Sequence, residues 1–195
     1  RKTTNEILYS QQFDNAYWYK QTSDATPNPV VTADYDTAPD GTLTADRVVM
    51  SLSPDNEWND ISLNNITLIS PATGQKYIQS IWLKASDAGQ VGKKVSMYCF
   101  QATYLSVYNA VLTVDWVRHE VSHSLIGTSS SLLVKYGKAR DSVGGILQSE
   151  MATDFLMWGA QLEASDTMGV YVPTTDSPAS GGEPLRPWSY IETDQ

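Results

Sequence analysis

The sequence has little cysteine, little positive charge and no long apolar run. Only Cys99 is a cysteine among 195 residues, so the chain cannot form an internal disulfide. It has 13 Lys and Arg against 22 Asp and Glu, and the net charge of -9 disfavours nucleic acid or an anionic membrane as partner. No apolar run reaches the roughly eighteen residues that a membrane span needs, so we expect no membrane insertion.

Motifs of common enzymes are also missing. The sequence has no nucleophile elbow, no P-loop and no dinucleotide fingerprint. We therefore predict a protein that is not an enzyme and that holds no cofactor. Cys99 lies among apolar residues and is expected to be a small buried side chain. The chain begins with Arg1 and has no signal peptide, which indicates a piece of a longer protein.

What is present is the balance of a globular domain, with 41% apolar and 18% charged residues. Short segments in which apolar and polar residues alternate are separated by turn residues, which predicts an all-β antiparallel sandwich. The expected strands are Ile7–Phe13, Arg47–Leu52, Ile61–Leu68, Lys76–Ala85, Val95–Phe100, Leu112–Leu125, Ser131–Lys138 and Asp154–Ser165. The phase slips at Asn64-Asn65, which predicts a bulge or turn. Ser23–Gly41 is expected to be a long loop, because it is rich in Pro, Gly, Asp and Thr.

The segment Asp154–Ser165 carries large side chains on both faces, so we expect it inside a sheet rather than at an edge. Alternation predicts that one face holds Leu156, Trp158, Ala160 and Leu162. The opposite face is expected to hold Phe155, Met157, Gln161 and Glu163.

Two motifs near the end of the chain carry a resemblance. Trp158-Gly-Ala-Gln-Leu-Glu163 followed by Val170-Tyr-Val-Pro-Thr-Thr175 resembles the C-terminal signature of a family of phage virion modules. Asn5–Phe13 with Asn15 and Trp18, and the loop Thr37–Asp46, resemble the opening of that family. The resemblance covers roughly residues 5 to 176. It implies a jelly-roll domain similar to carbohydrate-binding modules, as found in tail fibres, tailspikes and capsid fibres.

We therefore predict a jelly-roll β-sandwich over residues 1–176, followed by a linker and C-terminal tail over residues 177–195. The segment Ser177–Pro184 has the composition of a linker, because it is rich in Ser, Gly and Pro.

One motif supports a competing hypothesis. His119-Glu-Val-Ser-His123 matches the zinc-peptidase pattern H-E-x-x-H, and Glu150 follows at the place of a third ligand in thermolysin-like enzymes. Two histidines four residues apart share one metal only on a helix, since on a strand they lie roughly 13 Å apart. Val117 and Val121 favour a strand, so we expect the histidines to be separated.

We predict no metal site. Calcium is common in related sandwich modules, held by oxygen ligands. The aspartates that such modules place on the last strand are replaced here by Trp158 and Gly159.

The aromatic residues point to a ligand class. Six Trp and eleven Tyr against three Phe favour rings with a polar group, which can stack on a sugar and hydrogen-bond its hydroxyls. The predicted carbohydrate-binding residues are Trp18, Trp58, Tyr98, Tyr104 and Tyr108. Of these, Trp58 and Tyr104 are expected in polar loops. Packing against a neighbouring subunit is the alternative role for the loop aromatics. Trp82, Trp116 and Trp158 lie in apolar strands and are expected in the core.

Together these features predict a non-catalytic virion appendage module, assembled in the host cytoplasm, that binds a host surface glycan. The alternative is a purely structural module that joins a fibre or decorates a capsid. Its partners would then be other virion proteins. The resemblance also implies a homo-oligomer, with a trimer among the arrangements that virion fibres adopt.

Overall fold

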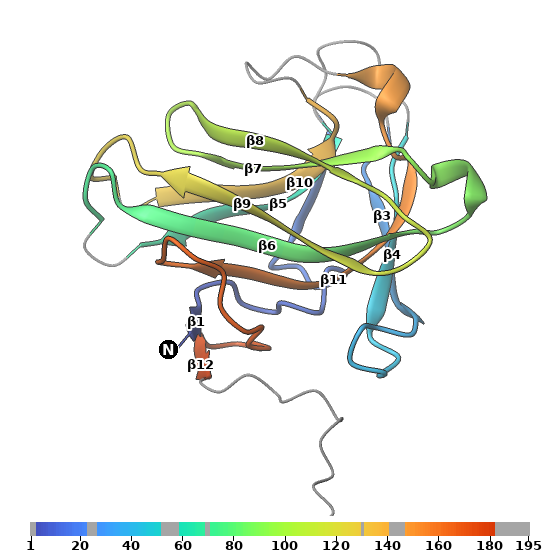
Figure 1. The fold of residues 1–195 in the computed structure, drawn as a ribbon, viewed down its shortest axis with the longest axis horizontal. Helices are drawn as coiled ribbons and strands as arrows, with labels where there is room; N and C mark the ends of the chain where they lie inside the picture. Colours follow the sequence, from blue (N-terminus) through green and yellow to red (C-terminus); the bar gives the residue numbers. More distant parts are fainter. Residues whose placement is uncertain are drawn as a thin grey trace, which may run out of the picture.

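The computed structural model describes residues 3–22, 27–51, 59–68, 71–129, 131–140 and 147–181, and these form two antiparallel five-stranded sheets (Figure 1). The predicted all-β sandwich is confirmed. The helical segments in these ranges are two short 3₁₀ turns, η1 (Ala88–Gln90) and η2 (Gln148–Glu150). Within the same ranges no helix has the length and apolar character needed to cross a membrane.

We name each sheet after its central strand. The β10 sheet has the order β2-β5-β10-β7-β8. Its strands are β2 (Tyr19–Thr22), β5 (Asn59–Thr67), β10 (Ser131–Lys138), β7 (Lys94–Phe100) and β8 (Tyr104–Val111). The β11 sheet has the order β3-β4-β11-β6-β9. Its strands are β3 (Val30–Asp36), β4 (Ala45–Val49), β11 (Asp154–Glu163), β6 (Lys76–Ala85) and β9 (Val117–Ser124). The segment Asp154–Ser165, which contains β11, is therefore inside a sheet, as predicted.

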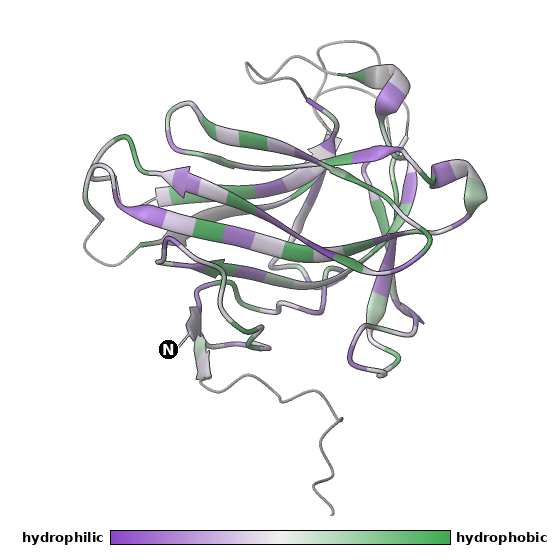
Figure 2. Cartoon of the chain, viewed as in Figure 1, coloured by the Kyte–Doolittle hydropathy of each residue, from purple (hydrophilic) through white to green (hydrophobic). Residues whose placement is uncertain are grey.

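The main core lies between the two sheets, and it forms because apolar residues alternate with polar ones along the strands (Figure 2). Ile61, Met97 and Val134 of the β10 sheet pack towards Ile81 and Phe155 of the β11 sheet, and all five are fully buried. Cys99 is a free, fully buried cysteine within this core, as expected.

The two ends of the domain meet in a short ribbon of β1 (Thr3–Asn5) and β12 (Ala179–Gly181) (Figure 1). The described fold therefore runs to Gly181, beyond the predicted boundary at residue 176. The rest of the predicted tail, residues 182–195, lies outside the described residues.

A bulge at Gly159 corrects the predicted faces of β11. Gly159 has φ of +66°, and the register with β6 shifts between Trp158 and Gln161. Beyond the bulge, Ala160 and Leu162 therefore belong to the core with Phe155 and Met157, while Gln161 joins Trp158 on the outer face. A Cβ at position 159 would lie 3.0 Å from the Trp82 ring, so glycine also permits close packing there.

Other local predictions had mixed outcomes. The slip at Asn64-Asn65 is confirmed, since the register of β5 with β10 shifts between Leu63 and Ile66. The segment Ile7–Phe13 is not a strand but a series of turns that buries its apolar side chains. The predicted loop Ser23–Gly41 contains the edge strand β3, and the predicted strand Leu112–Leu125 is β9 preceded by a turn.

The recognised end motifs hold the two ends of the chain together. Asn5 donates from its amide to the carbonyls of Ala160 and Val172, each at 3.0 Å, and its Oδ1 accepts from the backbone N–H of Leu162 at 3.1 Å. Gln161 accepts from the N–H of Val172 at 2.9 Å. The side chains of Asn5 and Gln161 therefore hydrogen-bond backbone groups that a neighbouring strand would otherwise pair. In this way the end motifs stabilise the fold.

Candidate functional site

The outer face of the β10 sheet, turned away from the β11 sheet, carries a polar and aromatic surface built from five strands. The register places Tyr19, Ser62, Lys135, Tyr98 and Val107 in one row across all five strands. A second row, two residues along each strand, consists of Gln21, Asp60, Gly137, Ser96 and Asn109. With strands about 4.8 Å apart, each row is roughly 19 Å long. We call this face of the sheet the row face. Its centre is buried and its partly or fully exposed residues lie around that centre. The buried residues are Ser62, Tyr98, Asp60, Gly137 and Ser96, and the others are Tyr19, Gln21, Lys135, Val107 and Asn109.

An aromatic and cationic cluster lies at the β7–β8 end of the row face. The rings of Tyr98 and Tyr104 have centroids 5.4 Å apart, and Phe100 lies 5.6 Å from Tyr104. The Arg140 guanidinium lies 5.5 Å from the Tyr98 ring and 5.9 Å from the Tyr104 ring. Because this cation covers the π-face of Tyr98, that ring is held in a fixed position under Tyr104 and Arg140.

The centre of the row face is an ordered polar network around Asp60, which is fully buried. Its Oδ2 accepts from the Tyr98 hydroxyl and from the Lys135 ammonium, each at 3.2 Å, and its Oδ1 accepts from the Gln21 amide at 3.3 Å. Burial, followed by the neighbouring Asp60 charge, raises the pKa of Tyr98 well above its ordinary value. The Tyr98 hydroxyl therefore stays protonated and donates a hydrogen bond to the Asp60 carboxylate.

Two of the five predicted aromatics come together at this site, but their environments differ from the prediction. Tyr98 is only 2% exposed, so it supports the cluster from below and cannot stack on a ligand. Tyr104 is half-buried and is the first residue of β8, not part of a loop.

The prediction for Trp18 is wrong as to its position. Trp18 is 1% exposed, packs on Phe13 and Tyr136, and donates from Nε1 to the Tyr9 carbonyl at 3.0 Å. Its neighbour Tyr19, at the start of β2, is 52% exposed and lies on the row face. Strand alternation therefore gives Tyr19 the position that we expected for Trp18. Trp58 lies outside the described residues.

Tyr108 is on the opposite side of its strand from Tyr104. It pairs with the core residue Met97, and its ring lies 6.0 Å from the His119 ring of β9. Its hydroxyl lies 3.4 Å from His119 Nδ1. At 39% exposed it lies at the open edge between the two sheets, separate from the row face.

Trp82, Trp116 and Trp158, which we expected in the core, belong instead to a second, smaller cluster outside the main core. Trp82 packs edge to face on Trp158 and Tyr171 on the outer side of the β11 sheet, and the Trp158 and Tyr171 rings are tilted, with ring centroids 4.8 to 5.3 Å apart. Trp116 packs against the same cluster and donates to the Thr37 carbonyl at 2.9 Å.

The zinc-peptidase hypothesis does not fit the backbone. His119 and His123 lie on the strand β9, paired with β6 without a register shift, so they are roughly 13 Å apart along the strand. His123 Nε2 is instead 3.0 Å from Gln79 in the core, and Glu150 forms an ion pair with Lys94. In the described part of the chain, no group of three or more His, Cys, Asp or Glu is arranged to hold a metal.

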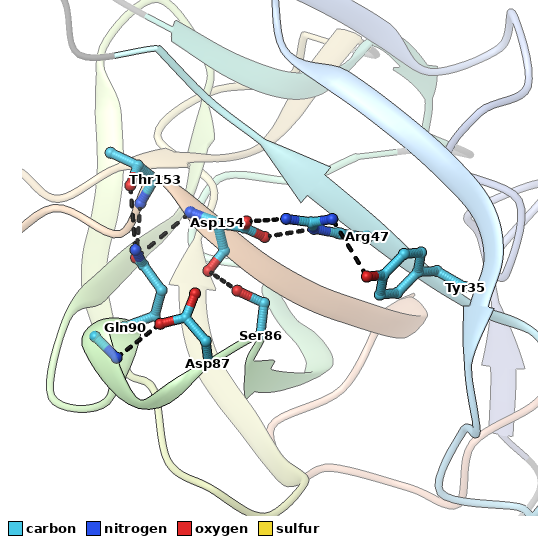
Figure 3. Close-up of polar contacts among 8 residues, drawn as sticks. Tyr35, Arg47, Ser86, Asp87, Gln90, Thr153 and Asp154 are labelled. Carbon is cyan, nitrogen blue, oxygen red and sulfur yellow. Dashed lines mark hydrogen bonds and ion pairs between the residues drawn. The ribbon is translucent and has the colours of Figure 1, made fainter.

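Asp154, the first residue of β11, belongs to a structural network (Figure 3). Arg47 donates to both of its carboxylate oxygens, and the Arg47 guanidinium also lies 5.0 Å from the Tyr35 ring. Burial alone raises the pKa of Asp154, but hydrogen bonds, chiefly from Arg47, outweigh burial, and the pKa lies below its ordinary value. Gln90 accepts from the backbone N–H of Thr153 at 3.0 Å, so the network joins the β6–β7 connection to β4 and β11.

An acidic cavity of about 350 Å³ lies between the N-terminal turns and β3–β4. Asp14, Asp34 and Asp46 are among its lining residues. Both carboxylate oxygens of Asp46 are already engaged, since they accept from the N–H groups of Phe13 at 2.7 Å and Asp34 at 3.0 Å. Asp46 therefore has a role in the structure of these turns.

Comparison with known proteins supports the fold but gives no sequence family. No family model and no curated protein sequence matches the chain. Among solved structures, the xylan-binding domain of carbohydrate-binding family 22 from Paenibacillus barcinonensis Xyn10C has a TM-score of 0.51 and 13% identity, with 86% of this chain and 95% of that chain covered. A second family 22 xylan-binding domain has a TM-score of 0.53 and 12% identity, covering 85% and 97%.

A phage protein is also similar in fold. The enzymatically active domain of tailspike protein 4 from bacteriophage CBA120 has a TM-score of 0.52 and 11% identity. The match covers 81% of this chain but only 21% of the tailspike structure. The chain is therefore a jelly-roll sandwich of the kind found in carbohydrate-binding modules.

Proposed function

We propose that this chain is a non-catalytic carbohydrate-binding module of a phage virion appendage, which attaches to a host surface glycan through the row face. The observation that carries the proposal is the pair of accessible tyrosines, Tyr19 and Tyr104, at opposite sides of a five-strand polar surface. Tyrosine rings stack on sugars, and the partly exposed Gln21, Lys135 and Asn109 of the same face carry amide and ammonium groups that hydrogen-bond sugar hydroxyls.

The side chains of the row face are held in place before binding, which favours the binding of a glycan. Arg140 fixes Tyr98, and Asp60 holds Tyr98, Lys135 and Gln21 in place, so little side-chain entropy is lost on binding. A surface roughly 19 Å long matches an extended chain of several sugar units better than a single monosaccharide. Weak binding by one module would be multiplied by the many copies on a particle.

Two similarities support the proposal. The solved family 22 domains of similar fold are xylan-binding domains, and the phage tailspike has a domain of similar fold. The second candidate function is a structural module of the virion. It is favoured by the central network, in which Asp60 is fully buried and engaged within the chain.

A panel of host surface polysaccharides and plant xylan, titrated into the purified domain by isothermal calorimetry, separates the two functions. The proposed function predicts saturable binding to at least one polysaccharide. The structural function predicts none at any concentration. Product analysis of the same mixtures tests the non-catalytic part, since released oligosaccharides would contradict it.

A further inference from the structure

The edge strand β9 has the features of an assembly surface. It pairs with β6 through eight consecutive residue pairs without a bulge, and within the described ranges no strand pairs with its other edge. Natural proteins protect such edges with proline, bulges, lysine or very short strands. β9 has no proline, bulge or lysine and is eight residues long, so the charged side chains Arg118 and Glu120 are the protective features that its sequence retains. Its free edge can therefore accept another strand.

The sequence of β9 is complementary to itself. When two copies pair antiparallel about a two-fold axis at His119, Arg118 of each lies opposite Glu120 of the other. Val117 then lies opposite Val121 of the second copy. Opposite charges and β-branched pairs in direct opposition both stabilise antiparallel strands. Centring the axis on Arg118 or on Glu120 instead places like charges opposite each other.

Arg118 of β9 makes its contacts within its own sheet, over the neighbouring strand β6. Its Nη1 donates to the Gly169 carbonyl at 2.8 Å, its Nη2 donates to Ser80 at 3.0 Å, and its guanidinium lies 4.4 Å from the Trp82 ring. Glu120 lies two residues along on the same face of the strand and is exposed. The pairing register therefore sets the exposed carboxylate of Glu120 opposite the strand position of Arg118, whose side chain turns from β6 towards the second strand when the two copies pair.

Apolar side chains beside this edge point to a protein partner. Tyr108 and Val111 of β8, Val114 of the following turn and Val117 of β9 are all exposed. Val111 pairs with Lys94 on the row-face side of β8, so Tyr108, Val114 and Val117 are the exposed apolar residues near β9 that a protein partner covers. The same segment lies at the side of the sandwich where β8 of one sheet approaches β9 of the other.

We propose that the chain forms a two-fold dimer by antiparallel pairing of β9 with β9 of a second copy, in the register centred on His119. The two β11 sheets then join into one continuous sheet. The row faces belong to the β10 sheets and stay open in this dimer. The proposal does not depend on glycan binding.

Sedimentation equilibrium over a series of protein concentrations tests the dimer. The wild-type chain is expected to dimerise, and Glu120→Arg is expected to raise the dissociation constant at least about tenfold, because it sets arginine against Arg118. Asp166→Arg is the matched control, since it makes the same charge change in an exposed turn after β11. A monomer at every concentration, or equal behaviour of the two variants, overturns the proposal.

Cysteine cross-linking tests the register. Directly opposite residues of an antiparallel pair have Cα atoms about 4.5–5.5 Å apart, within disulfide range, so His119→Cys is expected to give a covalent dimer on mild oxidation. Val121→Cys is the control on the same face, because the two copies of residue 121 lie roughly 13 Å apart along the strand. Cross-linking of Val121→Cys as efficient as that of His119→Cys contradicts the register.

Discussion

The Tyr98 hydroxyl donates a hydrogen bond to the fully buried carboxylate of Asp60, at 3.2 Å, and the Lys135 ammonium donates to the same oxygen. These three residues come from three neighbouring strands, β7, β5 and β10. The hydrogen bond from Tyr98 to Asp60 joins the polar centre of the row face to its aromatic end. It also makes the site and the stability of the sheet depend on the same groups.

Loss of Asp60 is therefore expected to be costly. Asp60→Ala leaves Lys135 largely buried without its carboxylate, and we expect a loss of about 3–5 kcal/mol in the free energy of unfolding, measured by urea denaturation. Replacing both residues, as Asp60→Ala with Lys135→Met, is expected to recover part of the loss.

The partly exposed pair Lys84–Asp36 provides the control for this measurement. Asp36→Ala removes a solvent-screened ion pair and is expected to cost about 0–1 kcal/mol. Equal losses for Asp36→Ala and Asp60→Ala would contradict the central role of Asp60.

Asn5 is expected to be the most sensitive residue of the end motifs. Besides Ala160, Val172 and Leu162, it also bonds the N–H of Ile7 at 3.1 Å, so Asn5→Ala leaves four buried backbone groups unpaired. We expect a loss of about 2–4 kcal/mol in chemical denaturation. Thr4→Ala removes an exposed hydroxyl contact one residue away and is expected to cost less than about 0.5 kcal/mol. If Asn5→Ala costs no more stability than Thr4→Ala, the pairing of β1 with β12 alone holds the two ends together.

Acid is expected to destabilise the fold through His123. Burial lowers the pKa of His123 to about 4, below the value of about 6.5 in the unfolded chain. Between these values the unfolded state binds more protons than the folded state, so stability is full above pH 6.5 and falls as pH falls towards 4. The loss is on the order of 3 kcal/mol.

Asp46 has the opposite effect on the pH dependence of stability. Burial raises its pKa to about 6, so its contribution is present below pH 4 and is lost as pH rises through 6. The His123 effect is therefore measured as the difference between the wild-type chain and His123→Gln, in urea titrations from pH 4 to 7. That difference is expected to shrink as pH falls, and a difference independent of pH would show that His123 does not carry the effect.

The central strands β6 and β10 were predictable, because runs of apolar residues bounded by turn residues are visible locally. Both ends of β6 and β10 agree with the expected ranges Lys76–Ala85 and Ser131–Lys138. The strand β3 was missed because it is an edge strand with most residues exposed on both faces, so it has no apolar period. The faces of β11 were wrong beyond Gly159, because a bulge reverses the alternation without changing the apolar composition.

The candidate site was only partly predictable. Aromatic composition led to Tyr98 and Tyr104, but the choice of Trp18 over Tyr19 depended on the phase of a short strand. That phase is fixed by pairing with β5 and has no local signal. Asp60 and Lys135 were missed because nothing near either residue in the sequence indicates that β5 and β10 are neighbours.

The most direct test of the central claim is calorimetric titration of the polysaccharide that binds, using the wild-type chain, Tyr104→Ala and Tyr35→Ala. Tyr35 is the matched control, because it is 50% exposed but lies on β3 of the other sheet. Binding through the row face predicts that Tyr104→Ala weakens the affinity about tenfold, or roughly 1.4 kcal/mol, while Tyr35→Ala changes it less than about twofold. An affinity unchanged in Tyr104→Ala, or reduced equally in both variants, would contradict the row face as the glycan site.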